Sequence, residues 1–568
     1  MERHLIGALN EAGEAFVRAY ANPDGTLRWK ERYEGGMNSS DDLYEAFRGL
    51  SLHYALGGAP ELDELHRWVW EGITRQFTRY GNIYREFDAN WDWMHHGEGY
   101  TSFYTFGLAD PDDAAFRRRS QRFAAMYTGE DPESPNYDPE RNIIRAVMNG
   151  SRGPKMEWTT RDWIPTNANL VYYHLPYDDI PGVDSASGWI NDDQFAIIVK
   201  TMSDRMARGD VPINMTVTPL IADAWLYTGD RKYQDWVLRY VGGWVERTRR
   251  NGGITPDNVG LSGQAGEYTG GHWWGGYYGW RWPRGGMDVV RAALTGAKVA
   301  LLMTGDPEWL DLPRSQLAVM REQGRQEGGA FLTPARYGRE GWHHYGPEPV
   351  YPYVWLWAVS QDERDWRQIE RLAETTPVSR DQDLAWAMYL AGRNPGYPAQ
   401  AMTADLNLIG QRLATVLDEH GDPDTWFDAH WMSRNPVHTA ALERLTLGAV
   451  PVDLRGEMLH AQLRYFCPET KRPGLPADVA ALVTKIDGQG VRVELVNLSL
   501  TASRRVIVQG GAYGEHIITS ANGQPAGQPF FEVSLAPGAG IELEVAMNRY
   551  AGAPSYAFPW QRSEEGGR

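Results

Sequence analysis

Cysteine is almost absent from this sequence, since Cys467 is the single one in 568 residues. One thiol cannot form an internal disulfide, and it excludes a metal site built from several cysteines. The chain also lacks a run of about 18 apolar residues, so no transmembrane helix is expected. Its first residues lack the basic and apolar segments of a secretory signal. We therefore expect a soluble, cytoplasmic protein, or a secreted or periplasmic one if a signal peptide has been removed.

Positive charge is scarce as well. Lys and Arg number 56 against 74 Asp and Glu, which gives a net charge of −18. Binding to nucleic acid requires a basic surface, so we expect no nucleic-acid partner. A small anionic ligand stays compatible with this charge, because a few arginines can bind one carboxylate within an acidic protein.

Aromatic residues that carry a polar group are abundant, with 24 Trp and 29 Tyr against 15 Phe. Such rings suit surfaces that stack on a ligand and form hydrogen bonds with it. They are densest in residues 270–286, GGHWWGGYYGWRWPRGG. The tryptophans there offer flat faces to a sugar ring, and the glycines allow a ligand to approach the backbone. The alternative is an aromatic-rich turn that joins two helices.

A recurring pattern predicts helical hairpins over residues 1–465. In each copy a glycine ends an apolar helix and an Asp or Pro begins the next one. The copies lie at 55–62, 106–112, 227–233 and 303–309, with a weaker one at 389–394. Alternating segments at 491–498 and 541–545 predict a small antiparallel β-sandwich over 474–550. Residues 551–568 are expected to form a tail that is charged and frayed after Pro559.

The Thr-Gly-Asp turns at 228–230 and 304–306 resemble those of the (α/α) toroids of carbohydrate-active enzymes, a superfamily of glycoside hydrolases and polysaccharide lyases. The resemblance implies a mainly α fold, an (α/α)n toroid of helical hairpins that binds substrate at one end, followed by the β-sandwich domain. The Tyr, His and Arg residues of 270–286 are similar in type to the active sites of toroid lyases that act on alginate, glucuronan or glycosaminoglycans.

On this resemblance we predict a polysaccharide or oligosaccharide lyase that cleaves uronate-containing glycans by β-elimination. The reaction requires a neutralised carboxylate and a side chain that removes the proton next to it. Tyr277 or Tyr278 is the predicted base or acid, His272 its partner, and Arg281 the residue that holds the carboxylate. The predicted substrate-binding residues are Trp273, Trp274, Trp280, Arg161, Asn167, Asn169, His95, His343 and His344.

Residues 90–100 support an alternative, a glycoside hydrolase such as a glucuronidase. We expect them to form a loop ahead of a helix that begins near residue 102, with His96 and Glu98 as further catalytic candidates. Hydrolysis needs a protonated carboxyl and a carboxylate, which Glu98 could supply with Glu267 or Asp257. Adjacent histidines point in different directions, so we expect no metal and no cofactor. A glycan-binding protein without catalysis is a third reading, and the oligomeric state stays open.

Overall fold

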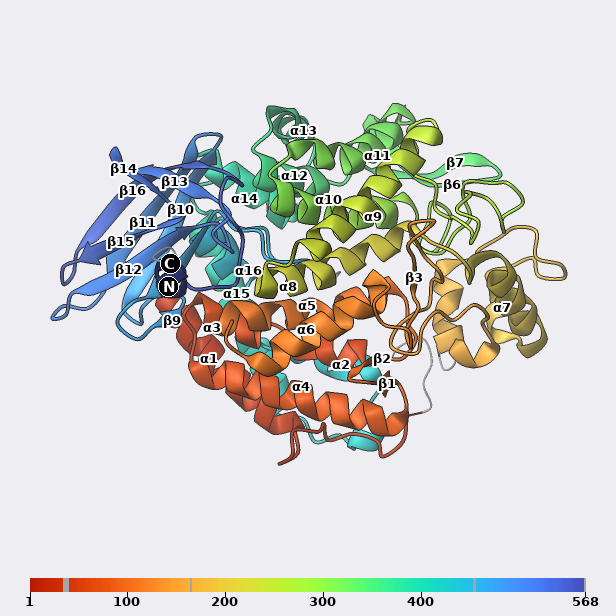
Figure 1. The fold of residues 1–568 in the computed structure, drawn as a ribbon, viewed down its shortest axis with the longest axis horizontal. Coiled ribbons are helices and arrows are strands. Elements are labelled where there is room, and N and C mark those ends of the chain that lie inside the picture. The colour runs from red at the N-terminus through yellow and green to blue at the C-terminus, as the bar shows by residue number, and fades with distance from the viewer. Residues whose placement is uncertain (34–39, 164–165, 453–455, 566–568) are drawn as a thin grey trace.

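The computed structural model describes residues 1–33, 40–163, 166–452 and 456–565, and for residues 166, 167 and 563–565 it describes the backbone alone. The protein is mainly α-helical with a β domain at its C-terminal end, as predicted. Figure 1 shows the β domain at one end of the molecule and the helices filling the rest.

The α-helices are α1 (Glu2–Tyr20), α2 (Asp41–Ala46), α3 (Leu50–Leu56), α4 (Pro60–Tyr80), α5 (Trp93–Ala109), α6 (Ala114–Thr128), α7 (Asp192–Met206), α8 (Thr218–Thr228), α9 (Arg231–Arg250), α10 (Gly286–Thr304), α11 (Asp311–Glu322), α12 (Tyr351–Ser360), α13 (Glu363–Ala373), α14 (Gln382–Leu390), α15 (Tyr397–Leu417), α16 (Ala440–Leu442) and α17 (Pro559–Glu565). The short 3₁₀ helices are η1 (Thr160–Asp162), η2 (Thr166–Tyr173), η3 (Ala186–Ile190), η4 (Pro212–Val217), η5 (Pro307–Leu310), η6 (Val378–Arg380), η7 (Pro423–Thr425) and η8 (Asp428–Ser433), and η9 (Glu443–Leu447) is a π-helical turn.

The strands are β1 (Ile83–Tyr84), β2 (Phe87–Asp88), β3 (Tyr137–Asp138), β4 (Ile143–Ile144), β5 (Arg325–Glu327), β6 (Ala330–Gly338), β7 (Gly341–Pro347), β8 (Leu463–Cys467), β9 (Arg472–Pro473), β10 (Val479–Asp487), β11 (Gly490–Asn497), β12 (Arg504–Gly510), β13 (Ile517–Ala521), β14 (Gln524–Gln528), β15 (Phe530–Leu535) and β16 (Gly540–Asn548). All of their pairings are antiparallel within the described residues.

The predicted turns at 227–233 and 303–309 are confirmed, whereas Gly107 of the 106–112 copy lies inside α5, which continues to Ala109. Gly229 and Gly305 end α8 and α10 in the left-handed conformation, which a residue without Cβ adopts easily. The carboxylate of Asp230 then accepts a hydrogen bond from the Lys232 N–H at 3.0 Å, and Asp306 accepts one from the Glu308 N–H at 2.9 Å. Each side chain caps the start of the next helix, so the chain reverses direction at these points.

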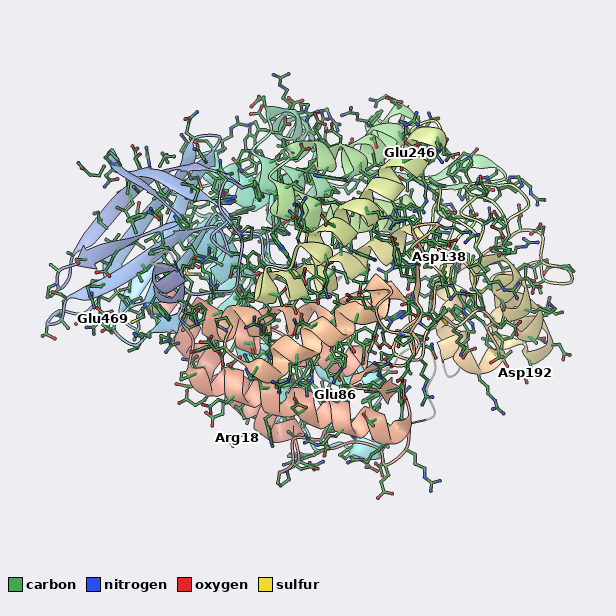
Figure 2. All side chains as sticks on the ribbon, viewed as in Figure 1. Arg18, Glu86, Asp138, Asp192, Glu246 and Glu469 are labelled. Atoms are coloured by element: carbon green, nitrogen blue, oxygen red, sulfur yellow. The ribbon has the colours of Figure 1, made fainter. Side chains whose placement is uncertain are left out.

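Helices that are buried nearly all round alternate with helices that bury a single stripe. The first group is α5, α8, α10, α12 and α14, and the second includes α4, α9, α11 and α13. A helix that is apolar all round belongs inside, and an amphipathic one outside. Figure 2 shows Arg18 of α1 and Glu246 of α9 at the outer edge of the helical region, where both side chains are exposed.

Neighbouring inner helices pack on one another. Helix α5 contacts α3 and α8, α8 contacts α10, α10 contacts α12, and α12 contacts α14. The last long helix, α15, packs on the first, α1.

Long connections lead into these inner helices. Residues 81–92 precede α5, 251–285 precede α10 and 323–350 precede α12. In Figure 1, α7, β6 and β7 lie at the end of the molecule away from the β domain. The third connection contains the β5–β6–β7 sheet.

The β domain consists of a five-stranded sheet, ordered β10-β11-β16-β13-β14, and a four-stranded sheet, ordered β15-β12-β8-β9. Its strands begin at Leu463, whereas the sequence predicted a start at 474. Strand β8 lies between β12 and β9 and is buried at every residue, so it lacks the alternation by which a half-exposed strand is recognised.

The predicted frayed tail is instead packed as far as residue 562. The hydroxyl of Tyr556 donates to Asp223 of α8 at 2.6 Å, and the rings of Phe558 and Trp560 pack on Phe466 of β8. Three aromatic side chains in an otherwise polar segment account for this docking. No helix in the described part of the chain is long and apolar enough to cross a membrane.

Candidate active site

Helix α5 begins at Trp93, so the prediction of a loop up to about residue 102 is wrong. Asp92 is fully buried and caps the helix: its Oδ1 accepts hydrogen bonds from the N–H groups of Met94 at 2.9 Å and His95 at 3.2 Å. The glycines at 97 and 99, which weaken a helical pattern, disguised the start of the helix. His95 and Glu98 therefore stand one turn apart on a rigid element.

The second oxygen of Asp92 binds two predicted site residues. Oδ2 lies 2.9 Å from Nδ1 of His95 and accepts a hydrogen bond from the Tyr277 hydroxyl at 3.0 Å. Burial lowers the pKa of His95, but the charge and hydrogen bond of Asp92 outweigh it and raise that pKa to about 9. The pKa of Asp92 is lowered, because the contributions of His95 and Tyr277 exceed the effect of its burial. At neutral pH the pair is an imidazolium and a carboxylate.

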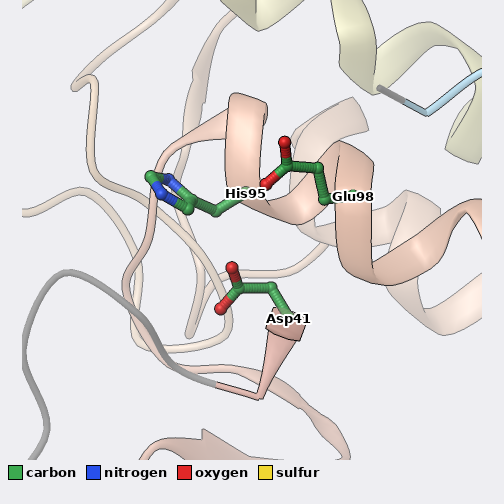
Figure 3. Close-up of side chains that lie close together, drawn as sticks. All are labelled: Asp41, His95 and Glu98. Carbon is green, nitrogen blue, oxygen red and sulfur yellow. The ribbon is translucent and has the colours of Figure 1, made fainter. Parts of the chain in front are cut away.

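Asp41, at the start of α2, brings a second carboxyl to this place. One ligand atom each from Asp41, His95 and Glu98 lies within 4.8 Å of the others. Figure 3 shows the two carboxyl groups and the imidazole approaching one another from α2 and α5. Gly99 makes the approach possible, because a Cβ there would lie 3.0 Å from Cα of Asp41. These three residues are called the acidic cluster below.

Glu98 is held in its protonated form at neutral pH. Burial raises its pKa to about 8, and the negative charges of Asp41 and Asp92 act in the same direction against those of His95 and Arg284. The neighbouring Asp42 also has a pKa well above the usual value, through burial and then the charges of Asp41 and Asp428. A carboxylic acid that keeps its proton at pH 7 is what general-acid catalysis needs.

The acidic cluster also has the donor atoms that a divalent cation would accept. At neutral pH, however, protons occupy His95 and Glu98, so a cation would have to displace them. The expectation that the site works without metal stays a prediction.

The loop 270–286 is organised around Asp257, whose carboxylate is fully buried. It accepts hydrogen bonds from the backbone N–H groups of Gly275 at 3.1 Å, Gly276 at 2.8 Å and Trp280 at 2.7 Å. A Cβ on Gly276 would lie 1.9 Å from the carbonyl oxygen of Asp257, so this glycine admits the protein's own backbone rather than a ligand. Asp257 therefore has a structural role, since it holds the backbone of the loop. Glu267 is likewise engaged, accepting from the Ser262 N–H at 2.9 Å.

Ring contacts divide this loop into two groups. Tyr277 and Tyr278 face the acidic cluster, with the Tyr278 ring 6.5 Å from that of His95. His272 is exposed and stacks on Trp274 at 4.8 Å. Among the ring contacts of the described residues, His272 pairs with Trp274 and with neither tyrosine. The predicted Tyr–His partners are therefore not brought together by these contacts.

The tryptophans differ in access. Trp273 is half-buried and stacks on Tyr337 of β6 at 4.7 Å, and Trp274 meets the same ring edge-on. Trp280 is fully buried, and its Nε1–H donates to the Thr255 carbonyl at 2.7 Å. Trp280 is thus placed as a core residue, and Trp273 retains an exposed part.

The predicted carboxylate holder, Arg281, is already in an ion pair. Its Nη1 lies 3.1 Å from Oε2 of Glu340, and its Nε donates to the Pro176 carbonyl at 3.0 Å. His343 lies 3.3 Å from the same glutamate. Arg284 is exposed and lies within electrostatic reach of Tyr278 and Glu98.

Of the remaining predicted residues, one is buried, and the others whose side chains the structure describes are exposed. His96 is buried, with Nε2 at 3.0 Å from the Asn149 carbonyl oxygen. Arg161 on η1 and Asn169 on η2 are exposed. The side chain of Asn167 lies outside the described part of the structure. His344 is exposed on β7.

Sequence reasoning missed Asp41 and Asp288, a buried acid in the first turn of α10. Both are acids in the first turn of a helix, where a negative charge commonly just stabilises the helix N-terminus. The distinguishing signal is burial, because Asp41 is 4 % and Asp288 2 % exposed.

A protein-family model described as Domain of unknown function (DUF8034) matches residues 1–331 and 325–443. The chain belongs to this family. The DUF8034 match includes the acidic cluster, Asp92 and the loop 270–286, and it ends before the first strand of the β domain. No curated protein matches the sequence. The description of the family names no activity.

Proposed function

We propose that the protein is a carbohydrate-active enzyme that cleaves glycosidic bonds by acid–base chemistry at the acidic cluster. The observation that carries the proposal is Glu98, a carboxylic acid with a pKa of about 8 beside the carboxyl of Asp41. Glycoside hydrolysis uses such a pair, one protonated carboxyl and one carboxylate.

The fold supports this reading if the helices form the closed (α/α) toroid that we propose. Inner helices that contact in sequence, and the packing of α15 on α1, are what a closed ring of hairpins requires. The half-buried Trp273 offers a flat face for a sugar ring, and it belongs to the loop that also carries Tyr277 and Tyr278.

In the proposed reaction Glu98 donates its proton to the oxygen of the leaving sugar, and Asp41 acts as the carboxylate partner. The spacing of their oxygen atoms, within 4.8 Å, is nearer to the separation of about 5–5.5 Å in retaining enzymes than to the about 6.5–9.5 Å of inverting ones. Asp41 would then be the nucleophile. The imidazolium of His95, oriented by Asp92, would stabilise negative charge beside it.

Elimination by a polysaccharide lyase is the second candidate, and Tyr278 favours it. Its ring lies beside His95, and Arg284 could neutralise a uronate carboxylate close by. Burial raises the pKa of Tyr278 well above its usual value, so the phenol keeps its proton at neutral pH. In that state it suits donation to the leaving oxygen better than removal of a proton from the substrate.

The test is to incubate the purified protein with a panel of neutral and uronate-containing polysaccharides and to measure two products. Hydrolysis yields new reducing ends alone, whereas elimination adds the ultraviolet absorbance of a conjugated, unsaturated uronate. We expect the first result. Binding without new reducing ends from any polymer would contradict both reactions and leave a glycan-binding protein. Chelator should not change the rate, and strong inhibition that added metal reverses would contradict the metal-free mechanism.

A further inference from the structure

Arginine and histidine side chains from three connections lie near one another at this end of the helical region. Arg284 comes from the loop before α10, Arg336 from β6, His344 from β7, and His174 from the residue after η2. The first and the last of them in the sequence, His174 and His344, are more than 100 residues apart. All four belong to connections at the same end of the helical region.

Short distances link these residues. The rings of His174 and His344 are 6.2 Å apart, and those of His343 and His344 are 4.9 Å apart. Arg336 pairs with His343 across the β6–β7 ladder. Its Nη2 donates to the carbonyl of Pro283 at 2.7 Å, which places the guanidinium next to the backbone of Arg284.

Three carboxyl groups, those of Glu340, Asp288 and Glu98, lie within electrostatic reach of this group. Glu340 is in an ion pair with Arg281 at 3.1 Å, and Glu98 keeps its proton. Burial lowers the pKa of Arg284, but the charge of Asp288 and of other neighbours outweighs it and raises that pKa. Burial lowers the pKa of His344, and the charges of Arg336, His343 and His174 lower it further. The pKa of Arg336 is lowered by burial and then by Arg281. The positive charges around His344 repel one another, and a bound anion would reduce this repulsion.

Three residues at this place have an uncommon backbone conformation. His174, Tyr278 and His344 have φ angles of 63°, 48° and 56°, in the left-handed region that residues with a Cβ rarely adopt. The carbonyl of His174 accepts hydrogen bonds from the indole N–H groups of Trp189 at 3.0 Å and Trp282 at 3.3 Å, which fix the strained residue. Such residues concentrate at ligand sites, where surrounding structure compensates the strain.

We propose that Arg284, Arg336, His174 and His344 form an anion-binding subsite for the carboxylate or sulfate of an acidic sugar, adjacent to the acidic cluster. Planar guanidinium groups bind both anions through paired N–H donors. The subsite differs from the sequence prediction, in which Arg281 held the carboxylate. The role of this subsite in cleavage rests on the proposed function. The binding of the anion itself can be measured without turnover.

The probes are sodium glucuronate, glucose 6-sulfate and glucose, titrated into the full-length protein and followed by ligand-observed NMR or calorimetry. We expect at least one anionic sugar to bind about tenfold more tightly than glucose, which corresponds to about 1.4 kcal/mol. The anionic sugar that binds more tightly identifies the preferred anion. A preference for glucuronate or for the sulfate supports the subsite. Equal binding of all three sugars, or no binding of the anionic ones, would overturn it.

Two variants locate the subsite. Arg336→Gln removes a guanidinium, and His344→Asn removes an exposed imidazole while keeping a residue that tolerates positive φ. Both should reduce the preference for the anionic sugar about tenfold and leave glucose binding unchanged. Arg339→Gln is the matched control, because Arg339 lies in the same hairpin turn but pairs with Asp179 at 3.0 Å. If Arg339→Gln has the larger effect, or if the other two have none, the assignment is wrong.

A third variant separates this proposal from the proposed function. Glu98→Gln should lose activity and keep the preference for the anionic sugar. If it keeps full activity and the preference persists, the acid–base proposal fails while the subsite stands. If activity is lost as expected but no variant changes anion binding, the subsite fails alone.

Discussion

A histidine and a glutamate three residues apart on α5 both carry a proton at neutral pH, for different reasons. His95 is charged because Asp92 lies 2.9 Å from its Nδ1, and Glu98 is neutral because burial and the charge of Asp41 oppose its ionisation. The acidic cluster can therefore supply a proton from Glu98 and a positive charge from His95 at the same place. Neither property follows from the residue types alone.

Activity should fall as pH rises through about 8, because Glu98 loses the proton that it donates. The raised pKa also predicts a falling free energy of unfolding between pH 4.5 and about 8, where the folded chain keeps a proton that the unfolded chain releases. The stability that His95 contributes is complete below pH 6.5 and is lost as pH rises through about 9. Initial rates and melting temperatures measured across this range test both statements. A rate that stays constant well above pH 8 would contradict the role of Glu98.

Asp92→Asn should lower the pKa of His95 toward 6.5 and reduce kcat about a hundredfold, because the imidazolium loses its carboxylate. Asparagine remains a good N-cap, so the fold should be kept. An NMR titration of the His95 ring and steady-state kinetics measure the two effects. The matched control is Asp113→Asn at the cap of α6, where Oδ1 accepts from Ala115 and Phe116. An unchanged His95 pKa, or an equal loss of kcat in the control, would count against this reading.

Residue types identified part of the candidate site, and tertiary packing decided the rest. Tyr277, His95 and Glu98 were predicted from the sequence and lie together at the acidic cluster. Asp41 could not be found, because α2 reaches α5 only in the folded chain. Two arginines three positions apart, Arg281 and Arg284, are equivalent in the sequence, but Glu340 engages one of them.

At the scale of elements, the approach of α2 to α5 decides whether the cluster forms. Gly99 faces Cα of Asp41, and this close contact is the reason for a glycine within α5. Glycine is unfavourable inside a helix, so Gly99 gives no signal in the sequence for the helix that carries the cluster.

Gly99→Ala should therefore displace α2 by a few tenths of an ångström and lower kcat, with a modest loss of stability of about 1 kcal/mol. Gly7→Ala in α1 is the control, since a Cβ there meets nothing within 4 Å and alanine stabilises a helix by about 0.5–1 kcal/mol. Kinetics and thermal unfolding of both variants give the comparison. Wild-type kcat in Gly99→Ala would show that the spacing of the cluster is not important for turnover.

At the scale of the whole molecule, periodicity predicted the helical hairpins and the β domain, and missed where they meet. Strand β8 has no alternation because both of its faces are buried, and the tail was judged by its charge although Tyr556 docks on α8. Contacts between domains depend on side chains far apart in the sequence, which patterns of neighbouring residues do not report.

Tyr556→Phe tests how strongly the C-terminal segment is coupled to the helices. It removes the hydroxyl that donates to the buried Asp223 and should reduce the free energy of unfolding by about 1–3 kcal/mol. Urea unfolding followed by tryptophan fluorescence and by circular dichroism should give one shared transition. Two separate transitions, with the helical one unshifted, would mean that the docking does not couple the two parts.

The most direct test of the proposed chemistry is the turnover of Glu98→Gln on a polysaccharide that the wild-type protein cleaves. Glutamine keeps the size of the side chain and cannot donate the acidic proton, so we expect kcat to fall about 10²–10⁴-fold. Glu246→Gln, on the exposed end of α9, serves as the control and should cleave the polymer at the wild-type rate. A Glu98→Gln variant that releases reducing ends as fast as this control would contradict the assignment of Glu98 as the proton donor.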